Sequence, residues 1–214
     1  MPKIITESQL EDEALKMLEN QGYNLIYGPE IAPAPEGNNE RKRYSDVVLV
    51  ERLKRAITKI NPTIPEEARE EALKKVIRND SQDLVLNNQQ FHKMLVDGVD
   101  VEYRKGDRIK GDKVWLFDFE NHENNEFLAI NQFTIIENQN NRRPDILIFV
   151  NGLPIILFEL KNPADEEATL TNAFNQIETY KLQIPSSFRF NEIVIISDGL
   201  ETHAGTITSD IGRF

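Results

Sequence analysis

Three side chains that could bind a metal ion and act on a phosphate lie at the ends of two apolar segments. Asp145 precedes the run Ile146–Val150, and Glu159 and Lys161 end the run that follows Asn151-Gly152. Paired carboxylates suit Mg²⁺, which is often held by one or two carboxylates, waters and substrate phosphates. A bound metal polarises a phosphoryl group, and a neighbouring lysine positions water or stabilises negative charge. This set of residues therefore predicts phosphodiester hydrolysis.

That chemistry requires the two apolar segments to form a hairpin with a particular register. Asn-Gly between apolar runs is the strongest short-range hairpin signal. A two-residue loop at Asn151-Gly152 would pair Asp145 with Phe158, whereas a three-residue loop would pair it with Glu159. Cross-strand partners lie ~5 Å apart at Cβ, and Lys161 shares a face with Glu159 because strands have period two. We therefore expect a three-residue loop, or an equivalent bulge, instead of a plain two-residue turn.

A purely structural interpretation of the same residues is also open. Glu159 and Lys161 could form a salt bridge at the end of a strand, while Asp145 caps a turn. The spacing alone does not separate this interpretation from a metal site.

Composition limits the classes of function. The 214 residues suffice for one large domain and include no cysteine, so disulfides and thiolate metal sites are excluded. No apolar run is long enough for a membrane helix, and we expect a cytoplasmic protein. The net charge of −11 argues against a free-standing nucleic-acid binder. Residues 41–59, with seven bases and two acids, form either a solvated face or a local phosphate-contacting face.

The hydrophobic pattern predicts an α/β fold with a central mixed β-sheet flanked by helices. We expect a first helix over Thr6–Gln21 with Thr6 as its N-cap, and a helix-rich insertion at about residues 45–96 that begins with Ser45 as a cap. We also expect strands over 23–27, within 112–119, 126–137, 145–161 and 192–197, and helices over 66–78, 87–96 and 165–182.

Two short motifs resemble those of known nucleases. Pro144-Asp145 followed by Glu159-Leu160-Lys161 resembles the PD-(D/E)xK motif, and Gln176 with Tyr180 resembles the QxxxY motif of RecB-like members. Gln176 and Tyr180 are four residues apart and so neighbour each other on one helical face. The first helix carries acids, Glu7 and Glu11, as such nucleases often do.

Longer stretches widen this resemblance to nearly the whole chain. The segments SDVVLVERLKRAITKINPTIP, NNEFLAINQFTIIE, RRPDILIFVNGLPIILFELKNP and GTITSDIGRF are similar to the N-terminal region of the restriction and motor (R) subunit of type I restriction enzymes. The resemblance implies a restriction-endonuclease-like core in one nuclease domain. It also implies that residues 1–214 are part of a longer chain, whose translocase domains alone would use ATP.

The resemblance further implies the roles of the site residues and the partners. Asp145 and Glu159 would bind Mg²⁺ and, with Lys161, form the catalytic set; the backbone carbonyl of Leu160 would be a further ligand. Gln176 and Tyr180 would support the site or contact DNA. Glu11 is preferred over Glu7 as the first-helix acid, although that choice stays open. The partners would be double-stranded DNA and the modification and specificity subunits.

Two other functions remain possible at this point. The helix-rich insertion could make the chain a non-catalytic docking module that couples the motor to other subunits. Alternatively, the same motif could belong to a stand-alone RecB-like repair nuclease that cleaves DNA unassisted.

Overall fold

A computed structural model describes residues 6–162 and 170–214. The chain divides into two compact units, which are described separately below. The first contains residues up to Val47, Phe127–Phe149 and Pro154–Phe214, and the second contains Val48–Glu126 and Val150–Leu153. Among the described residues, no helix has the length and apolarity needed to cross a membrane.

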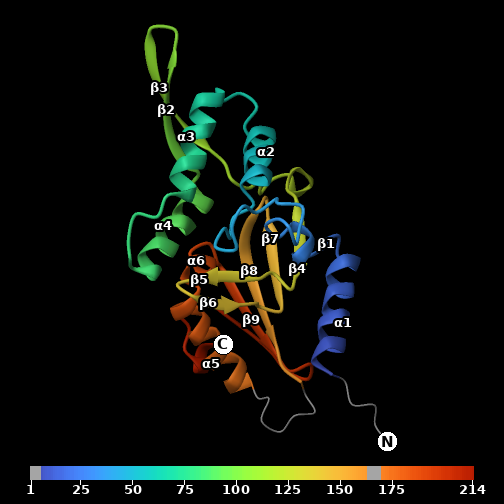
Figure 1. The fold of residues 1–214 in the computed structure, drawn as a ribbon. Helices are drawn as coiled ribbons and strands as arrows, with labels where there is room; N and C mark the ends of the chain where they lie inside the picture. Colours follow the sequence, from blue (N-terminus) through green and yellow to red (C-terminus); the bar gives the residue numbers. More distant parts are fainter. Residues whose placement is uncertain (1–5, 163–169) are drawn as a thin grey trace, which may run out of the picture. The chain divides into compact units, whose positions relative to one another are not determined.

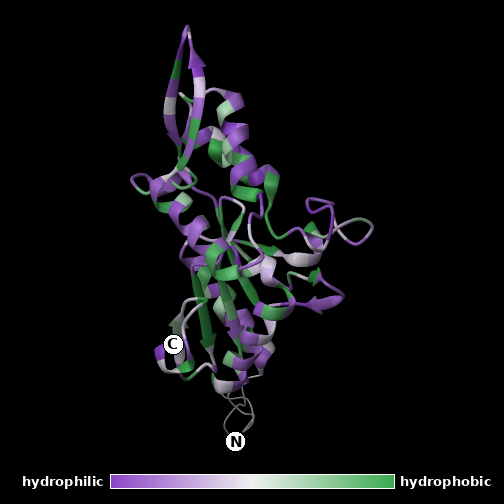
Figure 2. Ribbon diagram, turned by 90° about the vertical axis from the view of Figure 1, so that its left-hand side faces the viewer, coloured by the Kyte–Doolittle hydropathy of each residue, from purple (hydrophilic) through white to green (hydrophobic). Residues whose placement is uncertain are grey.

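A six-stranded mixed sheet forms the centre of the first unit (Figure 1), as the sequence predicts. Its order is β1-β4-β7-β8-β9-β10, with β1 Asn24–Tyr27, β4 Phe127–Asn131, β7 Ile146–Val150, β8 Leu153–Leu160, β9 Ile193–Ser197 and β10 Thr202–Gly205. Strand β1 is parallel to β4, β8 is parallel to β9, and β9 is antiparallel to β10. All five residues of β7 are buried, so apolar side chains fill both faces of the sheet at its centre. Figure 2 shows these strands as predominantly hydrophobic.

Helix α1, Glu7–Asn20, covers one face of this sheet. The predicted N-cap is confirmed: the Thr6 hydroxyl accepts the backbone N–H of Gln9, and the Gln9 side chain accepts the N–H of Thr6. This capping box satisfies two backbone donors that the helix leaves free. Leu10, Ala14 and Leu18, at helical spacing, pack against the buried strand residues.

Helix α5, Leu170–Gln183, follows strand β8 in the chain, and α6, Pro185–Phe188, comes directly after it. Ala173, Ile177 and Tyr180 are the buried residues of α5, and they lie at a spacing of four and three residues, as expected for one helical face. In Figure 1, α1 and α5 lie on different sides of the sheet. The predicted start of this helix at Asp165 lies outside the described residues.

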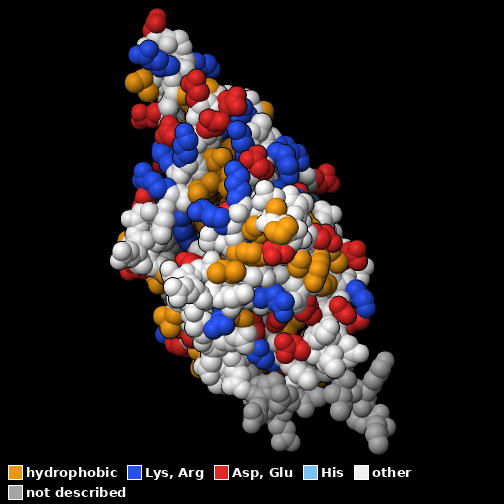
Figure 3. All heavy atoms as spheres, viewed as in Figure 1, with side chains coloured by type: hydrophobic (Ala, Val, Ile, Leu, Met, Phe, Trp, Pro, Cys, Tyr) orange, Lys and Arg blue, Asp and Glu red, His pale blue; other side chains and the backbone are white. Residues whose placement is uncertain are grey.

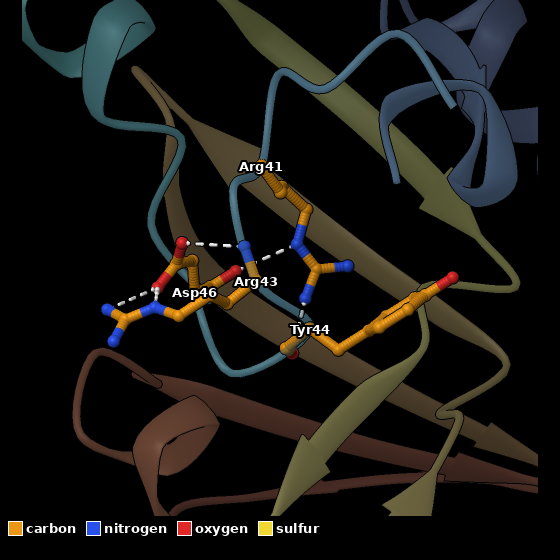
Figure 4. Close-up of polar contacts among 4 residues, drawn as sticks. All are labelled: Arg41, Arg43, Tyr44 and Asp46. Atoms are coloured by element: carbon orange, nitrogen blue, oxygen red, sulfur yellow. Dashed lines mark hydrogen bonds and ion pairs between the residues drawn. The ribbon is translucent and has the colours of Figure 1, made fainter. Parts of the chain in front are cut away.

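The loop between β1 and the second unit is organised around a buried arginine. It begins with the 3-10 helix η1, Gly28–Ile31. Arg41 is only 2% exposed, and its guanidinium donates to the carbonyl oxygens of Asp46 and Tyr44 at 2.8 and 2.7 Å (Figure 4). It also donates to the carbonyl oxygen of Thr134 at 2.9 Å. It also lies 3.6 Å from the ring centroid of Phe133. These contacts tie the loop to the segment between β4 and the small hairpin of β5, Ile135–Glu137, and β6, Asn140–Arg142.

The second unit contains three helices and a two-stranded ribbon. The helices are α2 Val50–Ile60, α3 Glu66–Ile77 and α4 Leu84–Asp97, and the ribbon consists of β2 Val99–Lys105 and β3 Arg108–Val114. Two predictions were wrong here. Ser45 caps no helix, because α2 begins after Leu49, which makes no side-chain cap. The strand near Trp115 ends at Val114, where the side chain of Asn61 accepts the N–H of Trp115 and donates to its carbonyl.

Short 3-10 helices complete the chain: η2, His122–Asn124, in the second unit and η3, Ile211–Arg213, in the first. The buried side chain of Asn151 organises the second unit at the β7–β8 turn. It accepts the N–H of Glu126 at 2.8 Å and donates to Leu116 and Asn125 at 2.9 and 2.8 Å. The Asn-Gly turn therefore has a tertiary role besides reversing the chain.

Candidate active site

Asp145 lies immediately before β7 and is half-buried. Its Oδ2 accepts the backbone N–H of Leu160 at 2.6 Å, although the two residues are 15 positions apart. The contact joins the start of β7 to the end of β8. Asp145 is thus held beside the residues that the sequence pairs with it.

Glu159 is 1% exposed and lies on β8, one residue before the strand ends. Its Oε1 accepts the Lys161 ammonium at 2.7 Å. Its Oε2 is buried and, among the described residues, has no hydrogen-bond partner. A buried carboxylate oxygen without a partner is costly, because it has lost its hydration without a replacement. The purely structural interpretation, a strand-end salt bridge, satisfies only one of the two oxygens.

Asp145 and Glu159 share one face of the sheet. Ile146 and Leu160 belong to the hydrophobic cluster against which α1 packs, and Phe158 packs against the same cluster. These residues are all even-numbered, and successive side chains of a strand alternate between faces. The odd-numbered Asp145 and Glu159 therefore lie on the opposite face.

The β7–β8 turn differs from the predicted loop. Strand β7 ends at Val150 and β8 begins at Leu153, and the two residues between them have φ of +53° and +82°, as in a type I′ turn. The expected three-residue loop is therefore wrong. Uninterrupted pairing from this turn would place Asp145 opposite Phe158, which faces the α1 cluster instead. The two observations together require one extra residue in one strand, the bulge that the sequence left as the alternative.

Burial is the largest cause of a raised pKa at both acids, and neighbouring negative charges add to it. Burial raises the pKa of Asp145 to about 6, against the opposing effect of the Leu160 N–H. Burial, followed by the negative charge of Asp145, raises the pKa of Glu159 to about 8. Two acids with raised pKa in one place indicate a functional site more often than a structural one. A cation bound between them would lower both pKa values, because it stabilises the charged form of each carboxylate.

A chain of hydrogen bonds connects Lys161 to α5. The Lys161 ammonium donates to Gln176 Oε1 at 2.8 Å, and Gln176 Nε2 donates to the Tyr180 hydroxyl at 2.6 Å. The backbone N–H of Lys161 donates to the carbonyl of Ser197 in β9 at 2.8 Å. The ammonium is therefore oriented by both Glu159 and Gln176. Gln176 and Tyr180, which the sequence predicts to be neighbours on one helical face, are in contact, and Gln176 also reaches Lys161.

The two acids of α1 are placed differently. Glu11 accepts hydrogen bonds from Asn131 at 2.8 Å and from Gln132 at 3.2 Å. Glu7 is exposed. After burial, the charge of Glu7 and then that of Glu11 contribute to the raised pKa of Asp145. Both acids act on the site electrostatically, so the choice between them stays open.

Asp145 and Glu159 could bind a divalent cation only if other ligands, such as water or phosphate, complete its coordination. In the part of the chain that the structure describes, no group of three His, Cys, Asp or Glu side chains is arranged to hold a metal. Asp145 and Glu159 supply two carboxylates, one of them with the unpartnered Oε2. Mg²⁺ keeps several waters and is commonly bound through one or two carboxylates plus substrate phosphate. The donor set therefore fits Mg²⁺ in that mode.

The basic segment contributes little free positive charge. Arg41 is buried, and most of the others are engaged: Arg43 with Asp46, Arg52 with Glu126, Lys54 with Glu70, and Lys59 with the carbonyl of Glu123. Lys42 and Arg55 are exposed. Most of the segment is thus used within the protein instead of forming the phosphate-contacting face that was one of two alternatives.

Comparison with known proteins agrees with this arrangement. Residues 4–213 match the family described as Type I restriction enzyme R protein N terminus. The chain belongs to this family. The mixed sheet flanked by helices is consistent with the restriction-endonuclease-like fold expected for it.

Two curated relatives are similar to this R-protein N terminus over nearly all of its 214 residues. The Type I restriction enzyme HindI endonuclease subunit of Haemophilus influenzae is 43% identical over 212 residues, covering 99% of this chain and 20% of the relative. The putative type I restriction enzyme MjaIXP endonuclease subunit of Methanocaldococcus jannaschii is 39% identical over 215 residues, with the same coverages. The chain spans about a fifth of the length of these relatives.

In this R-protein N terminus, the sequence analysis did not identify Asn131 and Gln132, which contact Glu11 beside the site. Asn131 ends β4 and Gln132 follows it with a positive φ of 56°, and both donate to Glu11. A polar pair after an apolar strand is a weak signal, because it is equally typical of an exposed loop. Their role follows only from the parallel pairing of β4 with β1 and the packing of α1.

Proposed function

We propose that this chain is the Mg²⁺-dependent endonuclease domain that cleaves double-stranded DNA within a type I restriction-modification complex. The observation that carries the proposal is the buried Oε2 of Glu159 beside Asp145 and Lys161, which has no hydrogen-bond partner in the described part of the chain. The family and the names of the relatives, which are endonuclease subunits, support a nuclease over other metal-dependent hydrolases.

Asp145 and Glu159 would hold the cation, and the carbonyl of Leu160 would be a further ligand. In an extended strand the N–H and C=O of one residue point to the same side. The N–H of Leu160 points to Asp145, so its carbonyl is directed to the same neighbourhood. When bound, Mg²⁺ would polarise the scissile phosphodiester and lower the pKa of an attacking water.

Lys161 would orient the water or stabilise charge on the phosphate. Its side chain is 13% exposed, and the ammonium is held by two hydrogen bonds, to Glu159 and to Gln176. Fixed donors act more strongly on a developing charge than mobile ones, since no reorganisation is needed during the reaction. Gln176 and Tyr180 are then positioning residues. ATP use and translocation would belong to parts of the protein beyond this chain, and the modification and specificity subunits would supply sequence recognition.

The test is DNA cleavage by the assembled enzyme with ATP and Mg²⁺, comparing wild type with Asp145→Ala and Lys161→Ala. We expect cleavage to be abolished while ATP hydrolysis continues. Matched controls are Asp12→Ala and Lys42→Ala, which remove the same charges from exposed positions of the first unit. Full cleavage by either site variant would reject the catalytic assignment.

A further inference from the structure

The outer half of the β2–β3 ribbon is exposed on both faces. Every residue from Arg104 to Gly111 is exposed, and Ile109 is 71% exposed. The ribbon turns at Gly106-Asp107, where Gly106 has φ of +65°. An isolated two-stranded ribbon is only marginally stable in water. The exposed outer half of this ribbon therefore depends on packing of its inner half.

The base of the ribbon is anchored within the second unit. Val99, Val101 and Val114 are each at most 2% exposed. Lys113 forms an ion pair with Asp100 at 2.6 Å, and these two residues lie opposite each other across the strands. At the base, opposite charges therefore face each other across the strands, which stabilises the pairing.

The tip breaks that rule. Lys105 and Arg108 lie directly opposite each other, and like charges in this position destabilise a ribbon. Asp112, the acid on the same face, is engaged by Lys110 and by the hydroxyl of Tyr103. Within the described residues, no acidic side chain is paired with Lys105 or Arg108. In the described part of the chain, Lys105 and Arg108 are thus two cations without an ion-pair partner, at the last paired position before the turn.

The tip is also positive against the trend of the whole protein. Residues 103–110, YRKGDRIK, contain four bases and one acid, whereas the chain has a net charge of −11. Figure 3 shows Lys and Arg side chains gathered at the outer end of the ribbon. A locally basic element on an acidic chain concentrates attraction for an anion at one place.

We infer that the tip of the β2–β3 ribbon binds the phosphate backbone of duplex DNA. A two-stranded ribbon fits the major groove of B-DNA, and Lys105 and Arg108 would neutralise phosphates there. An acidic protein surface is a poorer match, because the core of a protein interface is depleted in charged residues, while this tip carries four bases and exposes one large apolar side chain, Ile109. This inference rests on the proposed function, which makes duplex DNA the substrate. It adds a DNA contact outside the cleavage site.

The experiment measures binding of a labelled duplex of about 30 base pairs by the complete subunit that contains this chain, without nucleotide, between about 50 and 200 mM salt. The test variant is Lys105→Gln with Arg108→Gln. The matched control is Arg55→Gln with Lys74→Gln, which removes the same charge from exposed positions of α2 and α3. A third variant, Lys105→Arg with Arg108→Lys, exchanges the two side chains and keeps the charge.

We expect the test variant to bind about tenfold more weakly at low salt, with the slope of log affinity against log salt smaller by about 2. Its melting temperature should be unchanged or higher, because a like-charge pair is removed. The control and the exchanged variant should bind as wild type does. Wild-type binding by the test variant, or an equal loss in the control, would overturn the inference.

The inference and the proposed function fail separately. Asp145→Ala should abolish cleavage and leave this binding unchanged, because Asp145 is not part of the ribbon. If the test variant binds DNA normally but no longer retains its partner subunits, the ribbon is a protein-docking element and the DNA assignment is wrong.

Discussion

Asp145 accepts the backbone N–H of Leu160 at 2.6 Å. Because Leu160 lies between Glu159 and Lys161, this one bond ties the first acid of the site to the strand that carries the other two groups. It also partly offsets the burial that raises the pKa of Asp145. The position of Asp145 therefore depends on an acceptor oxygen, while its proposed binding of metal depends on negative charge.

Asp145→Asn separates these two properties. An asparagine oxygen can still accept the Leu160 N–H, but the side chain has no charge for a cation. We expect cleavage to fall at least 100-fold, a loss on the scale of removing a catalytic group. The melting temperature without metal should be unchanged or higher, since repulsion with Glu159 is removed. The rise in melting temperature on adding Mg²⁺ should disappear, and Asp12→Asn should keep it.

Stability without metal should fall as the pH rises. Folding raises the pKa of Asp145 to about 6 and that of Glu159 to about 8, above their ordinary values. The folded state therefore holds protons that the unfolded state has released. The stabilising contribution is fully present below about pH 4 and is lost as the pH rises through about 6 and then about 8. Thermal melts in a chelator across this range would measure the fall.

Mg²⁺ should oppose that fall increasingly at higher pH, because the cation competes with protons for the same carboxylates. In Asp145→Asn the pH dependence should be shallower, since Glu159 loses its charged neighbour. A wild-type protein whose metal-free stability stays constant between about pH 5 and 8 would contradict the raised pKa values.

Gln176→Ala removes one of the two groups that orient the Lys161 ammonium. We expect cleavage to fall about 10- to 100-fold, the usual effect of losing a supporting residue around a metal site. The effect should be on the rate at saturating DNA instead of on DNA affinity. Asn175→Ala, on an exposed position of the same helix, is the matched control. Equal losses in both would indicate a general disturbance of α5.

Arg41→Met tests the buried arginine of the β1 loop. The change leaves three carbonyl oxygens without their donor, so we expect a loss of about 3 to 5 kcal/mol in unfolding free energy. Urea unfolding measures it. Lys42→Met, at the exposed neighbouring position, should change the free energy by less than about 0.5 kcal/mol. A small effect at Arg41 would show that water replaces its hydrogen bonds.

Gly152→Ala and Gly106→Ala, in two different turns, separate the cost of a steric clash from the cost of a positive φ. Gly152 has φ of +82°, and an added Cβ would lie 2.5 Å from the carbonyl oxygen of Leu49. Gly106, with φ of +65°, has open space around it. We expect Gly106→Ala to cost about 1 kcal/mol from backbone conformation alone, and Gly152→Ala to cost clearly more. Equal losses would mean that the turn relaxes away from Leu49.

Local patterns in the sequence were sufficient for several features. The capping box at Thr6 and the apolar runs of β7 and β8 depend on residues close together in the chain. The chemistry proposed for Asp145, Glu159 and Lys161 stays a prediction. The family followed from motifs of the same kind. Such features are determined by neighbours within a few positions, so residue types and spacing are enough to predict them.

Tertiary structure decided what depends on distant partners. The pairing register could not be read from Asn151-Gly152, because a turn and a bulge act together and only the packing of Phe158 against α1 distinguishes the faces. Likewise, Glu11 is oriented by Asn131, Lys161 by Gln176, and most of the basic segment by acids and carbonyls far along the chain. The sequence shows which side chains are charged. Whether such a charge can bind a ligand depends on which groups folding brings within hydrogen-bond distance of it.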